Sequence, residues 1–262
     1  MGHFLKKEIL MPIFIKGIHV DAAKPIVCVP ITEGSMDGIF DTARDLIDAG
    51  VRMLEWRIDC FEEYEDADAV REVLDELQVM TKETILLATV RTVGQGGRAV
   101  LDEAQLVDIY DRIAQAHAAD IIDVEAFSFV DPTAIIRGLH IRGALVLLSH
   151  HEFTRTPEAA EMRGCLEKMA SLDGDLVKLA VMPHKPSDAF RLMEAAAEFH
   201  EVNRQMPLAA IAMGQKGALS RITGELFGSC ITFAAGSTAS APGQLPFAET
   251  GEALDFIHRY LG

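Results

Sequence analysis

The chain has 262 residues and carries 24 lysines and arginines against 40 aspartates and glutamates, a formal net charge of −16. Apolar residues make up 49% of the sequence, enough to fill a large core, so the composition excludes global disorder. The acidic balance argues against binding to nucleic acid, because proteins that bind it present a basic face to the phosphates.

The cysteine pattern and the hydropathy of the sequence indicate in which cellular compartment the protein resides. Four cysteines lie far apart and form no CxxC pair, which excludes a zinc pattern and a dense disulfide framework. No apolar run approaches the roughly 20 residues needed to cross a bilayer. The first residues lack the pattern of a secretory signal. We therefore expect a cytoplasmic protein with reduced thiols and no membrane partner.

Short apolar runs rich in β-branched residues alternate with longer amphipathic segments along the chain. Successive runs start roughly 20–40 residues apart, the length of one strand, one helix and two loops. The runs span residues 25–31, 52–58, 84–90, 120–126, 144–150, 175–181, 208–213 and 230–235.

The segments between the runs have the periodicity and termini of helices. Ile39, Ala43 and Leu46 recur at helical spacing after the first run. We expect Thr156 to cap the helix after the fifth run, and Ser187 to cap the next helix.

Eight such units without a linker predict a single (β/α)8 barrel domain over residues 1–262. The alternative is a doubly wound open sheet, but the first run leads into residues 31–34 without the glycine-rich phosphate turn of that fold. Residues 12–20 predict a short β-element ahead of the barrel. We expect it to close the bottom of the barrel and leave the active face open.

In such a barrel, catalytic groups lie at the C-terminal ends of the strands, and polar residues gather at these ends. Glu55, Arg57 and Asp59 share one face of the second strand by period-two alternation. The other polar residues at or just beyond strand ends are Arg91, His150, His151, Lys178, Arg221, Ser240 and Gln244.

Lys178 lies in the otherwise apolar strand 176–181. Burial disfavours an ammonium, so it lowers the pKa and frees the amine to attack a carbonyl carbon. The alternative is a structural lysine that pairs with an acid such as Asp123 or Glu125.

His150 and His151 are adjacent, so on a strand they face opposite sides and only one can enter the site. A histidine is suited to remove a carbon-bound proton and later to protonate a leaving hydroxyl. A supporting role or metal binding is the alternative, although the pair lacks helical ligand spacing.

Arg57, Arg91 and Arg221 are candidate carboxylate clamps, because a guanidinium binds a carboxylate through two parallel hydrogen bonds. Taken alone, each of them is more often an ordinary solvated or salt-bridged arginine.

Together these residues resemble type I 3-dehydroquinate dehydratase, the Schiff-base enzyme of the shikimate pathway. The resemblance runs from about residue 25 to 248. It is carried by six motifs: EWRID (55–59), VRTVGQGG (90–97), SHHEF (149–153), VKLAVMP (177–183), SRITGELFGS (220–229) and SAPGQL (240–245).

The resemblance implies a hydro-lyase that converts 3-dehydroquinate to 3-dehydroshikimate in aromatic amino acid biosynthesis or quinate breakdown. Lys178 would form the imine and His151 would be the general acid and base. The family fold is a (β/α)8 barrel, usually a homodimer, with no cofactor or metal. The implied substrate contacts are Glu55, Arg57, Arg91, Arg221, Ser240 and Gln244.

One position departs from the family pattern. Gln95 stands where the family commonly has Glu, and an amide keeps the hydrogen-bonding capacity but cannot ionise. If that carboxylate helps the reaction, Gln95→Glu should raise the rate, and an unchanged pH–rate curve would count against the idea. His150 and Glu152 also vary from the common Asn-His-Asp pattern.

Two other functions remain open from the sequence. A class I aldolase would share the barrel and the lysine, but it would need a phosphate site, for which only residues 214–217 (GQKG) give a hint. A weak paralogue that binds dehydroquinate-like ligands as a sensor is the third possibility, supported only by Gln95.

Overall fold

Eight parallel strands form a barrel in the computed structural model, which describes residues 13–261. They run in the order β10-β3-β4-β5-β6-β7-β8-β9, and a bridge between Leu208 and Ser229 joins β9 to the start of β10. The strands are β3 (Ile26–Ile31), β4 (Met53–Arg57), β5 (Ile85–Thr89), β6 (Ile121–Glu125), β7 (Leu145–Glu152), β8 (Leu176–Val181), β9 (Leu208–Ala212) and β10 (Ile231–Phe233).

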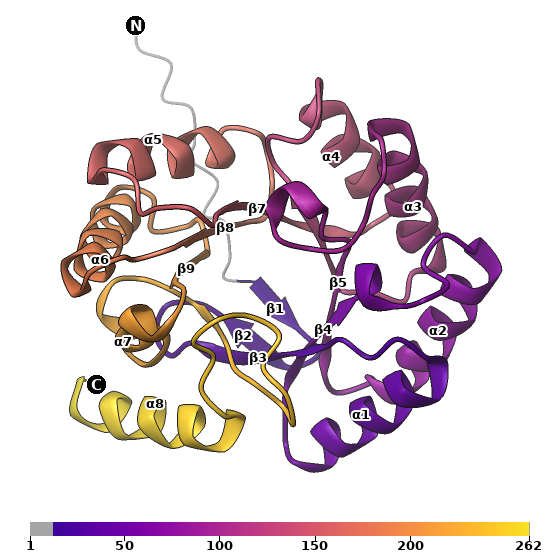
Figure 1. The fold of residues 1–262 in the computed structure, drawn as a ribbon, viewed down its shortest axis with the longest axis horizontal. Coiled ribbons are helices and arrows are strands. Elements are labelled where there is room, and N and C mark those ends of the chain that lie inside the picture. Colours follow the sequence, from indigo (N-terminus) through magenta and orange to yellow (C-terminus); the bar gives the residue numbers. More distant parts are fainter. Residues whose placement is uncertain (1–12, 262) are drawn as a thin grey trace, which may run out of the picture.

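Helices surround this ring (Figure 1). They are α1 (Met36–Asp48), α2 (Ala67–Met80), α3 (Glu103–Ala116), α4 (Pro132–Ile141), α5 (Ala159–Ala170), α6 (Pro186–Val202), α7 (Ala218–Ile222) and α8 (Phe247–Leu261). The predicted (β/α)8 barrel is confirmed, with a strand in each of the eight apolar runs, and the doubly wound sheet is excluded. The expectation about a secretory signal falls largely on residues 1–12, which lie outside the described residues.

Both predicted helix caps are wrong. The helix α5 begins at Ala159 with Glu158 at the N-cap position, so Thr156, whose side chain is buried, lies two residues before the cap. The helix α6 begins at Pro186, two residues earlier than a cap at Ser187 predicts, since proline favours the first helical position. Asp188 accepts the hydrogen bonds at that end, from the backbone N–H groups of His184 (2.9 Å) and Lys185 (3.2 Å).

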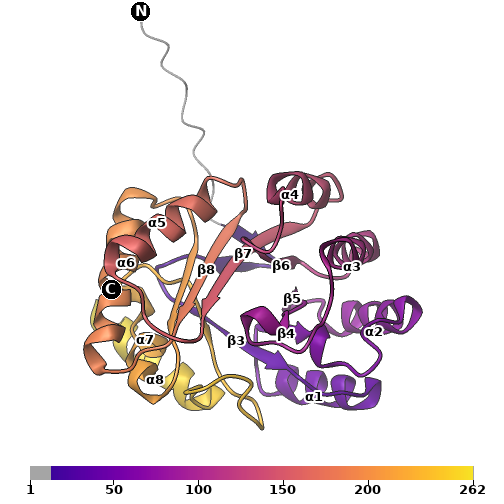
Figure 2. The ribbon, with the colours of Figure 1, turned by 45° about the horizontal axis from the view of Figure 1, so that its top comes forward.

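The predicted N-terminal β-element is an antiparallel hairpin of β1 (Ile13–Ile15) and β2 (Ile18–Val20). Val20 is fully buried in the apolar cluster that fills the lower barrel interior, beside Cys28 and Met53. Figure 1 shows the hairpin crossing behind the centre of the ring, and Figure 2 shows it at the end of the barrel from which the N-terminal trace leaves. The prediction that this element closes the bottom is therefore confirmed.

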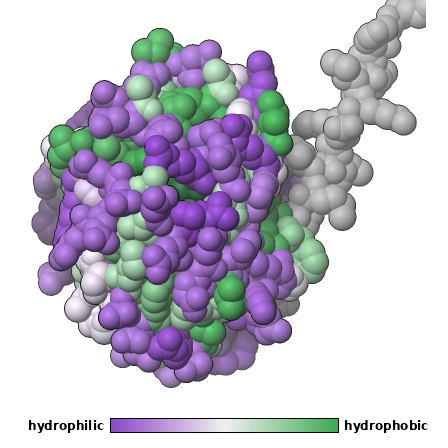
Figure 3. Space-filling model, turned by 90° about the vertical axis from the view of Figure 1, so that its right-hand side faces the viewer, coloured by the Kyte–Doolittle hydropathy of each residue, from purple (hydrophilic) through white to green (hydrophobic). Residues whose placement is uncertain are grey.

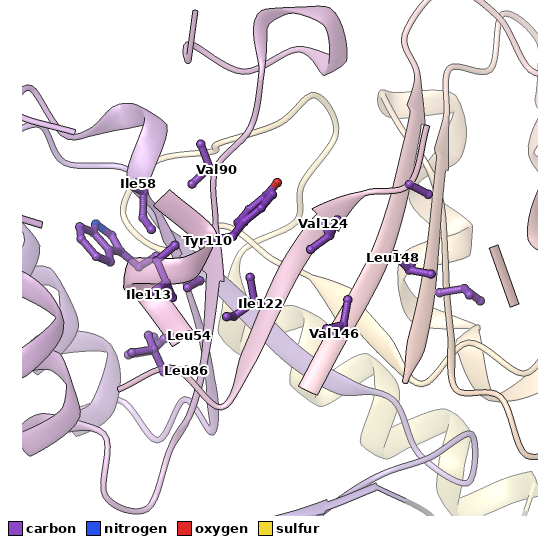
Figure 4. Close-up of a cluster of buried hydrophobic side chains, with 14 of the residues drawn as sticks. Leu54, Ile58, Leu86, Val90, Tyr110, Ile113, Ile122, Val124, Val146 and Leu148 are labelled. Carbon is purple, nitrogen blue, oxygen red and sulfur yellow. The ribbon is translucent and has the colours of Figure 1, made fainter. Parts of the chain in front are cut away.

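The main core lies between the strands and the helices (Figure 4). Alternate strand residues such as Leu54, Leu86 and Ile122 point outward, and Tyr110 and Ile113 of α3 pack on the same layer. The intervening residues point into the barrel, where Met53, Ile85 and Ile121 form its lower layer. The polar residues above them therefore face the open end.

Hydrophilic residues dominate the outer side that carries α2 and α3, with smaller hydrophobic patches between them (Figure 3). No helix within residues 13–261 is long and apolar enough to cross a membrane. All four cysteines, which lie in this part of the chain, are free thiols.

Candidate active site

Neighbouring strands β7 and β8 carry the two residues expected to do the chemistry. Ser149 pairs with Lys178, and His151 pairs with Ala180. Residues two apart on a strand share a face, and Ala180 belongs to the interior apolar cluster. Lys178 and His151 therefore both point into the barrel, with His151 one step closer to the open end.

The Lys178 ammonium is buried at 5% exposure and lies 3.9 Å from the centre of the Phe233 ring. Its Nζ is 3.7 Å from Glu55 Oε1 and 3.8 Å from Asp123 Oδ2. Within residues 13–261 it forms no hydrogen bond. Burial lowers the pKa of Lys178, although the two carboxylates oppose the shift. The amine is thus removed from water, and its distances to the two carboxylates are longer than hydrogen bonds.

Arg91, just beyond the C-terminal end of β5, belongs to a buried hydrogen-bond network that was not predicted. Its guanidinium donates to Asp123 (2.6 Å), Glu125 (3.1 Å) and Ser149 (2.9 Å). Ser149 in turn donates to Asp123 (2.6 Å). The two carboxylates of β6 therefore hold the Arg91 guanidinium in a fixed orientation.

Arg57 is held in the same manner by Asp59, through two hydrogen bonds of 2.8 Å. Asp59 is buried and also accepts from the backbone N–H groups of Arg91 (3.2 Å) and Arg98 (3.0 Å). These hydrogen bonds lower the pKa of Asp59 even though burial opposes them. Asp59 thereby fixes Arg57 at the mouth of the barrel, a role that the sequence pattern did not assign.

Arg221 differs from the other two arginines. It is 2% exposed, and among residues 13–261 its guanidinium donates only to the backbone carbonyls of Phe233 (3.0 Å) and Pro242 (3.1 Å). Its Nε is buried without a partner among the described residues. Burial lowers the pKa of Arg221 to about 10. A buried cation without a carboxylate partner is suited to receive an anionic ligand.

The loop between β10 and α8 lies beside Arg221. Within it, Gln244 Oε1 accepts from the Ser240 backbone N–H (2.7 Å), and Gln244 Nε2 donates to Ser240 Oγ (2.9 Å). The Gly214 backbone N–H donates to the Pro242 carbonyl (2.8 Å). The loop is thus fastened to the loop after β9, next to the carbonyl that Arg221 binds.

His151 is partly buried and contacts the loop after β5. Gln95 Oε1 lies 3.0 Å from His151 Nδ1, and the rings of His151 and Phe153 stack with centroids 6.1 Å apart. Burial, and then the positive charges of Arg91 and Lys178, lower the pKa of His151 well below its ordinary value. Its imidazole is thus suited to act as a base at neutral pH.

His150 faces away from the barrel interior, on the opposite side of β7 from His151, as expected for adjacent strand residues. Its ring contacts Phe127 edge-on at 5.2 Å between centroids, and its Nδ1 is buried without a partner among the described residues. Only the second histidine of the pair enters the site.

The structure brings the predicted residues to one end of the barrel, where (β/α)8 enzymes carry their active sites. Fold and site together define an enzyme of the (β/α)8 class. The chain belongs to the type I 3-dehydroquinase family, whose model matches residues 27–260. Members of this family are carbon–oxygen lyases, which confirms the expected enzyme class.

Curated relatives cover almost the whole chain. The 3-dehydroquinate dehydratases of Bacillus licheniformis and Clostridioides difficile are each 34% identical over 248 residues, which is 94% of this chain and 98% and 96% of theirs. A crystal structure of the type I enzyme from Clostridium difficile, with covalently modified comenic acid, has a TM-score of 0.92 at 33% identity and covers 96% of this chain and 99% of that one. The enzyme from Geobacillus kaustophilus has a TM-score of 0.92 at 28% identity, covering 96% and 98%.

Proposed function

We propose that the protein dehydrates 3-dehydroquinate to 3-dehydroshikimate, the reaction for which its curated relatives are named. The observation that carries this proposal is the buried Lys178 amine, which lies on the strand next to His151 and has a lowered pKa. The covalently modified comenic acid in the Clostridium difficile relative supports covalent chemistry in this family.

The reaction begins at the C3 ketone. The neutral Lys178 amine adds to the carbonyl carbon, and loss of water gives a protonated imine that draws electrons from C2. His151 removes the C2 proton and leaves an enamine. The enamine then expels the C1 hydroxyl, which leaves as water with the proton carried by His151. Hydrolysis of the conjugated imine releases the product and restores the amine.

Substrate binding is assigned to groups around this pair. Arg221 is the proposed partner of the ring carboxylate, because it alone of the three predicted arginines has no carboxylate partner within residues 13–261. The other proposed contacts are Glu55, Arg57, Arg91, Ser240 and Gln244. These groups hold the substrate so that C3 meets the amine and C2 meets the imidazole.

The test is turnover of purified protein with 3-dehydroquinate, followed by the absorbance of the conjugated product. A class I aldolase would instead cleave sugar phosphates and leave 3-dehydroquinate unchanged. A sensor would bind 3-dehydroquinate in calorimetry without converting it. Either of these results would overturn the proposal.

We further propose that the enzyme works as a homodimer in the cytoplasm. Two exposed aromatic side chains of α8, Phe256 and Tyr260, lie against each other and offer an apolar contact surface. The four scattered free thiols suit a reducing compartment. Light scattering of the purified protein checks the assembly, and a mass equal to one chain would contradict it.

A further inference from the structure

The two carboxylates beside Lys178 are each hydrogen-bonded to another side chain. The Thr89 hydroxyl of β5 donates to Glu55 Oε1 (2.9 Å), and the same oxygen lies 3.7 Å from Lys178 Nζ. Asp123 Oδ2 lies 3.8 Å from Nζ and accepts from the Arg91 guanidinium at 2.6 Å. In both cases the oxygen that approaches the amine already accepts a hydrogen bond from a different donor.

Ser149 holds the second oxygen of Asp123. Its hydroxyl donates to Asp123 Oδ1 (2.6 Å) and accepts from the Arg91 guanidinium (2.9 Å). Ser149 is fully buried, and it pairs with Lys178 in the register of β7 and β8. A rotation of the Asp123 carboxylate toward the amine would therefore break at least one of these hydrogen bonds.

Glu55 is restrained at one oxygen. Within residues 13–261 the Thr89 hydroxyl alone donates to the Glu55 side chain, and both residues are buried. The 3.7 Å between Glu55 Oε1 and Lys178 Nζ is longer than a hydrogen bond, but a small rotation of either side chain would close it. Without the Thr89 hydroxyl, this oxygen would be free to accept from the ammonium.

We propose that Thr89 and Ser149 are positioning residues that keep the carboxylates of Glu55 and Asp123 from pairing with Lys178, so that the amine stays available to attack a ketone. This inference rests on the proposed function, in which a neutral amine begins the reaction. A hydrogen-bonded carboxylate would hold the ammonium form, which has no electron pair for the attack. At their present distances the carboxylates still favour the positively charged imine that forms next.

Other titratable groups also face the amine. They are Cys28 of β3, Arg91 beyond β5 and His151 of β7, whereas the strands β5, β9 and β10 carry no titratable side chain. Within residues 13–261 the Thr89 hydroxyl bonds to none of these three groups, but Ser149 also binds Arg91. Thr89 therefore gives the cleaner test, and Ser149 gives an independent second one.

The experiment measures the reactivity of the amine in the free enzyme. Trace acetic anhydride acetylates only the neutral form of a lysine, so the yield at Lys178, read by peptide mass spectrometry as the pH is varied, gives the midpoint of its ionisation. The pH dependence of kcat/KM with 3-dehydroquinate is the second measurement.

Four variants are compared with the wild type. Thr89→Val keeps the shape of the side chain and removes the hydroxyl, Thr89→Ser restores it, and Ser149→Ala removes the other hydroxyl. The control is Thr81→Val, at a fully buried threonine before β5 whose hydroxyl donates to the Leu77 carbonyl (2.7 Å), at the end of the barrel opposite the site.

We expect Thr89→Val and Ser149→Ala each to raise the acetylation midpoint of Lys178 by about 1–2 pH units, because a hydrogen bond to a carboxylate stabilises the ammonium. Below the wild-type midpoint, kcat/KM should fall about 10- to 100-fold, since each pH unit changes the neutral fraction tenfold. Thr89→Ser and Thr81→Val should keep the wild-type midpoint.

An unchanged or lower midpoint in Thr89→Val and Ser149→Ala would overturn the inference, even if both variants lose activity equally at every pH. A midpoint that moves in only one of them would contradict the role of the other hydroxyl, and one that rises equally in Thr81→Val would show a general loosening of the barrel. If the wild type does not convert 3-dehydroquinate, the proposed function fails, while the acetylation midpoints still decide what the two hydroxyls do.

Discussion

At the scale of single residues, the four cationic side chains of the site differ in whether a carboxylate lies beside them. Asp59 pairs with Arg57, the β6 carboxylates pair with Arg91, and Glu55 lies nearest to Lys178. Among the described residues only Arg221 is left with backbone carbonyls. A protein with a net charge of −16 can therefore still present one unmatched positive charge to an anionic substrate.

We predict that Arg221→Met raises KM for 3-dehydroquinate, with little change in kcat. A charge-assisted hydrogen bond contributes roughly 1.5–3 kcal/mol, which corresponds to about 10- to 100-fold in affinity. Arg221→Lys keeps the charge without the paired donors and should lose less. Steady-state kinetics measure both variants, and a wild-type KM in Arg221→Met would remove this residue from the substrate site.

A second residue-scale prediction concerns the titration of His151. Because burial and the nearby cations lower its pKa below the ordinary value of 6.5, the ring should stay neutral as the pH falls through 6.5 and take up its proton only at lower pH. An NMR titration of the free enzyme measures the midpoint. A midpoint at or above 6.5 would show that the surrounding cations do not act on this ring.

At the scale of elements, the loop after β5 packs closely against the residues after β7. Gly96 has a φ of +80°, and a Cβ there would overlap the ring of Phe153, which stacks on His151. Gly96→Ala should therefore displace Phe153, disturb the imidazole and lower kcat. Gly143→Ala is the matched control, since Gly143 has a φ of +81° and no atom near a Cβ.

Both glycine variants should lose similar stability from the backbone strain of a positive φ, and only Gly96→Ala should lose additional stability and activity. Urea unfolding and kcat measured side by side test this. Equal activity in the two variants would show that the contact between the loops does not position His151.

The N-terminal hairpin supports the barrel from the end opposite the site. Val20→Ala removes two buried methyl groups from the interior cluster, so we expect the free energy of unfolding to fall by about 1–3 kcal/mol. The folded fraction should keep its kcat and KM. Denaturant unfolding with kinetics on the same sample measures this, and a large loss of kcat would connect the bottom of the barrel to the chemistry.

At the scale of the whole molecule, the sequence predicts the architecture because each βα unit repeats the same local pattern. Strand alternation also predicts that only one of His150 and His151 enters the site, and the family resemblance indicates that it is His151. The helix starts predicted from Thr156 and Ser187 were wrong: Glu158 is at the N-cap of α5 and Lys185 at the N-cap of α6, where Pro186 takes the first helical position that proline favours.

The contacts that tune the site could not be predicted from sequence spacing. Gln95 lies 56 residues before His151, and Ser128, whose hydroxyl accepts from Gln95 Nε2 (3.4 Å), belongs to a loop that carries no recognisable motif. Such contacts depend on how three loops pack together at the barrel mouth. Periodicity in the sequence predicts strands and helices, but it does not predict contacts between loops. The resemblance marked Gln95 as a departure, but only the structure shows its two-sided hydrogen bonding.

Borohydride reduction in the presence of 3-dehydroquinate tests the central claim most directly. The reductant converts an imine to a stable secondary amine, so peptide mass spectrometry should find a substrate-derived adduct on Lys178. The same treatment should leave Lys178→Met unlabelled, while Lys82→Met, at an exposed lysine before β5, should be labelled like the wild type. Rapid turnover without any adduct on Lys178, or an adduct on another lysine, would contradict the account.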